Sequence, residues 1–120
     1  MTSPQTAQLK LFDVTNIIIT LTRGEYAELD VSLYNQDETP HILTEGETLT
    51  LSVKRKTTDL TPIFQKVLKQ GDELVFVFLP EDTKDLAFGT YRYDIEFNTA
   101  DGKPDTIIKP HDFIIGEEVT

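Results

Sequence analysis

Cysteine and tryptophan are both absent from this sequence of 120 residues. Without cysteine the chain has no disulfide scaffold, no thiolate zinc or iron–sulfur site and no cysteine nucleophile. Basic residues are also few, since 11 lysines and arginines stand against 21 acidic residues and give a formal net charge of -10. A protein that binds the phosphate backbone needs a cationic face. We therefore predict no nucleic-acid partner.

Long hydrophobic runs are missing as well, because no segment approaches the roughly 20 apolar residues of a membrane span. The first ten residues, MTSPQTAQLK, lack the basic and apolar regions of a secretory signal. The composition therefore predicts no membrane partner. A chain of this length fits one domain with one modest core. We expect that domain over residues 16–120, preceded by an N-terminal arm or edge strand over residues 1–15.

Strand periodicity is the dominant pattern in the sequence. Apolar and polar residues alternate over Ala27–Leu33, Thr48–Val53 and Tyr91–Phe97. This alternation is typical of strands with one buried and one solvated face. It places the two tyrosines and the phenylalanine of the last segment in the core, where we also expect Phe76, Phe78 and Phe88.

Further segments have less regular strand patterns: Leu9–Phe12, Asn16–Leu21, Ile63–Leu68, Leu74–Leu79, Thr106–Ile108 and Asp112–Ile115. The continuous apolar run Leu74–Leu79 predicts a central strand or one that is covered on both faces. The mixed pattern of Ile63–Leu68 indicates a bulge. Pro110 has no backbone N–H to donate, so we expect it to break or edge the last strand region.

Turn signals connect these segments. Gln70-Gly71-Asp72 and Ala100–Lys103 lie between neighbouring strands. Pro80–Leu86 predicts one short helical turn, because proline followed by acidic residues favours a helix start. The turn spacing favours an antiparallel sandwich or barrel, and we predict an all-β, antiparallel immunoglobulin-like β-sandwich of about 7–9 strands.

The residues capable of chemistry do not combine into a site. His41 and His111 lack the spacing of metal ligands, so each is expected in a loop or at an edge. Asp94 and Glu96 could serve glycoside hydrolysis only if they faced each other across a cleft, and their strand parity places them on the solvated face. The sequence has no nucleophile elbow and no phosphate-binding loop. We therefore predict no catalytic, cofactor-binding or metal-binding residue.

Three other features have structural explanations. The basic run Lys54-Arg55-Lys56 fits a solvated strand end, a partner contact or a guard against edge pairing. Asp101–Asp105 fails the pattern of a calcium loop, because Lys103 stands where a ligand is required. Tyr34 is the aromatic residue that we most readily place at the surface.

The C-terminal half contains a series of motifs that is similar to a known family. An apolar strand leads into PEDTKDL and GTYRYDI, followed by a glycine turn, TII, FII and a final EVT. Upstream, ITLTRGEYAELDVSL and LTLSVKRK are similar to the family's first strands. From Asn16 to Thr120 the chain resembles small β-sandwich virion proteins of phages and prophages of Gram-positive bacteria. Within that family it is similar to the N-terminal domain of upper baseplate proteins.

This resemblance implies a non-enzymatic virion structural protein: a tail, baseplate, connector or capsid-associated component, assembled in the bacterial host cytoplasm. Its partners would be other virion proteins and copies of itself, bound through surfaces and open strand edges. From the residues alone, a carbohydrate-binding or adhesive module remains an alternative. So do an enzyme that uses Asp94 and Glu96, and an inhibitor that mimics nucleic acid through its negative surface.

Overall fold

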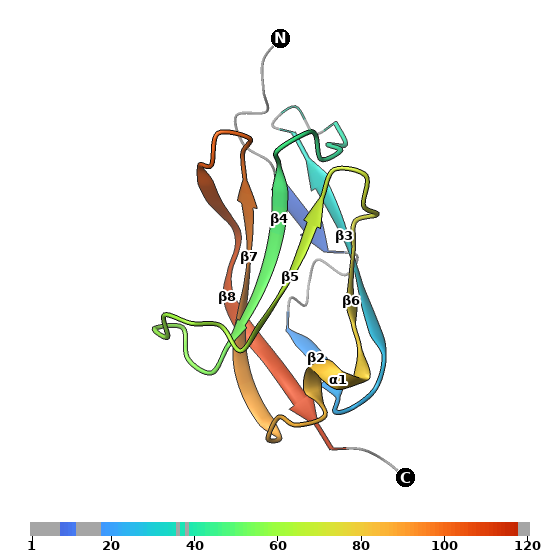
Figure 1. Cartoon of the computed structure of the whole chain (residues 1–120), viewed down its shortest axis with the longest axis vertical. Helices are drawn as coiled ribbons and strands as arrows, with labels where there is room; N and C mark the ends of the chain where they lie inside the picture. The colour runs from blue at the N-terminus through green and yellow to red at the C-terminus, as the bar shows by residue number, and fades with distance from the viewer. Residues whose placement is uncertain (1–7, 12–17, 36, 38, 118–120) are drawn as a thin grey trace.

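The structure is a computed structural model that describes residues 8–11, 18–35, 37 and 39–117, with backbone alone for 8–11 and 105–109. These residues form strands and one helical turn in the following order (Figure 1): β1 (Gln8–Leu11), β2 (Ile19–Thr22), β3 (Ala27–Tyr34), β4 (Thr48–Lys54), β5 (Phe64–Lys69), β6 (Val75–Phe78), α1 (Pro80–Thr83), β7 (Gly89–Asn98) and β8 (Pro104–Gly116). The prediction of a mostly β chain is confirmed.

The strands are arranged in two sheets. One has three strands in the order β1-β3-β6, and the other has five in the order β2-β8-β7-β4-β5. β2 runs parallel to β8, with Ile19 opposite Phe113, whereas the other paired strands are antiparallel. The prediction of an antiparallel fold is therefore wrong at this edge, and the larger sheet is mixed. Because β2 and β8 come from opposite ends of the chain, no hairpin turn imposes an antiparallel direction on them.

Side chains from both sheets pack into one core. The alternation in β4 and β7 turns Leu49, Leu51 and Tyr93 inward, and each is at most 1% exposed. Phe78 of the smaller sheet lies 5.6 Å from Phe113 of the larger sheet, measured between ring centroids. Burying one such large side chain stabilises a fold by roughly 1.5–3 kcal/mol. Burial of these side chains is therefore the main interaction that holds the two sheets together.

Two predictions about individual strands require correction. Of the two alternatives for Leu74–Leu79, a central strand or a strand covered on both faces, the first is wrong, because β6 lies at the edge of its sheet. Val75 and Val77 on its second face are half-buried, so apolar residues are tolerated on both faces. The bulge predicted in Ile63–Leu68 is also misplaced, because β5 pairs with β4 in unbroken register.

The irregularity lies in the ladder between β7 and β8. Thr106–Ile108 and Asp112–Ile115 belong to one strand, β8, which continues through Pro110. The β7–β8 register shifts between Tyr93 and Glu96, opposite this segment. β2 pairs only with Phe113–Gly116, so the missing N–H of Pro110 removes no β2 hydrogen bond. Its carbonyl accepts a hydrogen bond from Nη2 of Arg92 at 2.9 Å.

The helical turn α1 lies within the predicted segment and connects three parts of the fold. The Asp82 carboxylate accepts a hydrogen bond from the backbone N–H of Leu79 at 2.7 Å and forms an ion pair with Lys66 of β5 at 2.6 Å. The hydroxyl of the buried Thr83 accepts the N–H of Gly24, between β2 and β3, at 2.8 Å. These contacts fix α1 against the end of the strands.

The two ends of the molecule are formed by different connections (Figure 1). The β3–β4, β5–β6 and β7–β8 connections lie at the upper end, and the β2–β3 turn, α1 and the connection to β7 lie at the lower end. Of the predicted segment 1–15, β1 is described and pairs with β3 at the edge of the smaller sheet. The other residues of that segment, and residues 16 and 17 of the predicted strand Asn16–Leu21, lie outside the described residues.

Candidate functional site

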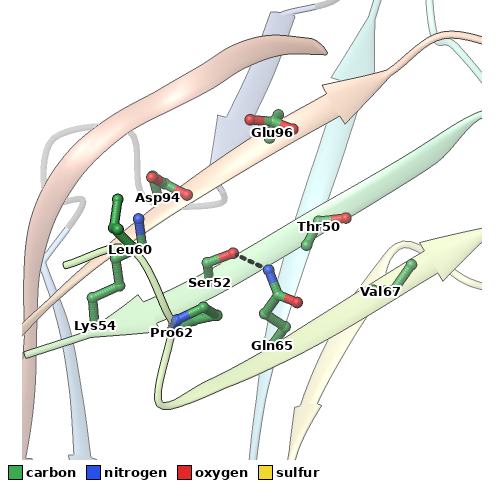
Figure 2. A pocket seen from close by; sticks show the side chains of 9 residues that line it. All are labelled: Thr50, Ser52, Lys54, Leu60, Pro62, Gln65, Val67, Asp94 and Glu96. Atoms are coloured by element: carbon green, nitrogen blue, oxygen red, sulfur yellow. Dashed lines mark hydrogen bonds between the residues drawn. The ribbon is translucent and has the colours of Figure 1, made fainter. Parts of the chain in front are cut away.

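A shallow hollow of about 330 Å³ lies on the outer face of the larger sheet, opposite the core. We call it the sheet-face hollow (Figure 2), and it is lined by residues of β4, β5, β7 and the β4–β5 loop: Thr50, Ser52, Lys54, Leu60, Pro62, Gln65, Val67, Asp94 and Glu96. Leu60 is 97% exposed and Val67 is 53% exposed. The hollow therefore has a polar floor, and three apolar side chains, Leu60, Pro62 and Val67, complete its lining.

Asp94 and Glu96 stand side by side on β7 in this hollow, both half-buried (Figure 2). Burial raises the pKa of Asp94 above its ordinary value of 3.8, the Lys54 cation opposes this rise, and the charge of Glu96 adds to it. The parity prediction that both residues face away from the core is confirmed. Because alternate strand positions are about 6.6 Å apart, the two residues are neighbours on the same face of β7.

A side-chain hydrogen bond joins β4 and β5 on the floor of the sheet-face hollow. The Ser52 hydroxyl accepts a hydrogen bond from Nε2 of Gln65 at 2.8 Å, and neither histidine lines the hollow. A serine nucleophile requires an adjacent base that is itself oriented by a third group. Asp94 lies opposite Ser52 in the ladder, but the hydrogen bond that the structure gives the Ser52 hydroxyl is to Gln65. Within the described part of the chain, no group of three or more histidine and carboxylate side chains could hold a metal ion.

A second hollow, of about 270 Å³, lies in the lower half of the molecule where β4 leaves the sheet. We call it the basic hollow, and its lining is Arg55, Lys56, Ala87, Phe88, Gly89, Thr90 and Tyr91. β4 ends at Lys54, which pairs with Arg92 of β7. β7 extends beyond this pair, because its first residue is Gly89. Gly89–Tyr91 therefore pair with β8 on one side and face the hollow on the other.

Cations lie over the aromatic rings around this hollow. The guanidinium carbon of Arg23 lies 3.9 Å from the ring centroid of Phe88, and that of Arg55 lies 5.7 Å from the centroid of Tyr91. Arg55 and Lys56 are exposed, and neither forms an ion pair with any residue that the structure describes. The basic hollow thus combines positive charge, aromatic surface and an open strand edge.

The two histidines lie in different surroundings. His41 lies in the β3–β4 connection as predicted, but it is only 7% exposed. Its Nε2 is 2.9 Å from Oε1 of Glu47, which also accepts the Thr44 backbone N–H at 2.8 Å. Burial acts to raise the pKa of Glu47, but the hydrogen bonds from Thr44 and His41 outweigh it and hold the pKa below 4.5. His111 is half-buried in β8.

Two predictions about aromatic residues require correction. Tyr34 is half-buried, whereas Tyr26 is 56% exposed and is the tyrosine most open to solvent. Phe88, predicted in the core, is 45% exposed. It precedes β7, where strand parity does not apply, so the periodicity gave no sign of its exposure or of the basic hollow. The run Lys54–Lys56 was the one available signal of that hollow.

No family model matches this chain, and no curated protein is similar to it at a significant level. Among the described residues, no helix is long and apolar enough to cross a membrane.

Proposed function

We propose that the fold is an immunoglobulin-like β-sandwich. In immunoglobulin domains the third, sixth and seventh strands share a sheet, and variable-type domains add a further strand beside the third. Here β4, β7 and β8 share a sheet, β5 extends it beside β4, and β3 and β6 pair in the other. This correspondence of strand order supports the proposal.

A hydrogen bond at the start of β7 also supports this fold. The Tyr91 hydroxyl donates to the carbonyl oxygen of Ala87, four residues upstream, at 2.7 Å. Immunoglobulin-like sandwiches have a tyrosine in this position, at the corner where the chain crosses between sheets, with the same bond to the upstream backbone. In this chain α1 and Leu86 make that crossing from β6 to β7.

We further propose that the chain is a non-enzymatic structural component of a phage virion that acts by protein–protein assembly. The observation that carries this proposal is the series PEDTKDL–GTYRYDI, the basis of the family resemblance, which forms α1, the Tyr91 corner and one wall of the basic hollow. In the structure these motifs form the crossing between the sheets and part of the surface of the basic hollow. The open edge of β7 gives the surface a means of binding another chain.

Particle composition tests this function. Particles are purified by density gradient from cells that produce the phage and then analysed by mass spectrometry beside the whole lysate. We expect peptides of this chain to be enriched in the particle fraction and to stay there after a high-salt wash. If the peptides are abundant in the lysate and absent from the particles, the proposed function is wrong.

The alternative of a carbohydrate-binding or adhesive module rests on the sheet-face hollow, whose polar floor could bind sugar hydroxyls. It predicts reproducible binding on a glycan array that is lost in Asp94→Asn and Glu96→Gln and retained in Tyr26→Phe. An array without reproducible binding would reject this alternative.

A further inference from the structure

The upper end of the molecule is acidic. Its exposed carboxylates are Asp37 and Glu45 in the β3–β4 connection, Asp72 and Glu73 between β5 and β6, and Asp101 between β7 and β8. Lys103, which lies 3.7 Å from Asp101, and the exposed Lys69 at the end of β5 offset part of that charge. A net negative surface therefore extends over the connections at this end.

An apolar side chain projects from the same end. Ile42 is 78% exposed, although both of its neighbours, His41 and Leu43, are buried. Its segment belongs to no named strand, and the exposed Glu45 follows in a turn that the Glu47 N–H closes onto the Thr44 carbonyl at 3.0 Å. The segment from Ile42 to Glu45 thus presents an apolar side chain followed by a carboxylate.

The basic hollow has the complementary features. Phe88 and Ala87 supply apolar surface, and Arg55 and Lys56 supply positive charge. Gly89–Tyr91 supply a backbone edge that no strand among the described residues pairs with on the β4 side. Another chain can contact such an edge through its backbone while its side chains occupy the adjacent hollow. The Asp59 carboxylate accepts a hydrogen bond from the backbone N–H of Lys56 at 3.2 Å, a contact that does not involve the Lys56 ammonium group.

We propose that the basic hollow binds the segment Ile42–Glu45 of a second copy of this chain, with Ile42 against Phe88 and Glu45 beside Arg55 and Lys56. Two copies of charge -10 repel each other in most orientations. An orientation that brings an acidic surface against a basic one is therefore favoured over the others. Because it uses two different surfaces, the contact is heterologous and produces a ring or an open row of copies.

This inference rests on the proposed assembly function and names one partner for it. The two can fail separately, because attachment to the particle is measured by mass spectrometry and self-association by sedimentation of the purified chain.

Analytical ultracentrifugation of the full chain tests the contact. Between roughly 10 µM and 1 mM protein, we expect the weight-average mass to rise above 13.6 kDa. We also expect the rise to weaken with salt, because the Debye length falls from about 10 Å at 0.1 M to about 3 Å at 1 M. A mass that stays at 13.6 kDa throughout, or an association that strengthens with salt, would overturn the proposal.

Charge reversal identifies the surfaces. Arg55→Glu should weaken self-association at least about tenfold, because it places like charges together at the contact. Lys84→Glu, which changes the net charge equally at an exposed position outside the hollow, is the matched control and should change it less than about twofold. Equal effects of the two variants would contradict the proposal.

Complementation provides the independent check. Glu45→Lys alone should self-associate as weakly as Arg55→Glu, and a mixture of these two variants should recover association. Both substitutions are at exposed positions, so thermal unfolding should match that of the wild type. If the mixture stays monomeric, the assignment of these two surfaces to one contact is wrong.

Discussion

The Tyr91 hydroxyl offers a test of the fold that changes one atom. Tyr91 is 3% exposed, and its hydroxyl makes the 2.7 Å hydrogen bond to Ala87. Tyr91→Phe retains the ring and removes this bond, which costs about 1 kcal/mol for a partly buried pair. Since a change of this size shifts the melting temperature of a domain of this size by about 4 °C, it is well within measurement.

The matched control is Tyr26→Phe. The Tyr26 hydroxyl donates to the Glu28 carboxylate, so the same chemical change again removes one hydrogen bond, but here at the exposed surface. We expect less than about 0.5 kcal/mol of destabilisation in this variant. Urea unfolding followed by circular dichroism compares both variants with the wild type. If Tyr91→Phe costs no more than Tyr26→Phe, the Tyr91 bond does not stabilise the crossing between the sheets.

Three further predictions concern a turn and two carboxylates. Gly46→Ala should cost about 2–3 kcal/mol in urea unfolding, because the residue has a φ of 85° and a Cβ would lie 3.0 Å from that of Ala100. Gly71→Ala, at a φ of 91° with open space around it, should cost only about 1 kcal/mol; equal costs would contradict the close approach. The native pKa of Glu47 lies below 4.5, so its contribution to stability is present above that value and is lost as the pH falls through the native pKa. Glu47→Gln should therefore melt below the wild type at pH 7 and approach it in acid, and a constant gap would refute this. Burial raises the native pKa of Asp94 above 3.8, so ionisation opposes folding as the pH rises through the native value. Asp94→Asn should melt slightly above the wild type at pH 7 and equal it at pH 3, and a lower melting point at pH 7 would show that the carboxylate stabilises the fold.

The sequence predicted those parts of the fold that depend on local periodicity. The alternation over Thr48–Val53 and Tyr91–Phe97 identified β4, β7 and their buried faces, because side-chain direction in a strand depends only on position parity. Parity also placed Asp94 and Glu96 correctly on the outer face. These signals require no knowledge of which strands pair.

Features that depend on distant pairing could not be predicted in this way. The parallel direction of β2 is set by β8, nearly one hundred residues later in the chain, and no turn signal records it. The basic hollow exists because β4 ends opposite Arg92 while β7 continues to Gly89, a register relation that neither strand shows alone. The burial of His41 likewise depends on its position beside Phe97, 5.9 Å away between ring centroids.

The most direct test of the central claim is the copy number of this chain in purified particles. Isotope-labelled standard peptides allow the chain to be counted against the main capsid protein in gradient-purified particles. A structural component should give the same ratio across independent preparations and after repeated high-salt washes. A ratio that varies between preparations and falls with each wash to the level of abundant lysate proteins would contradict a structural role in the virion.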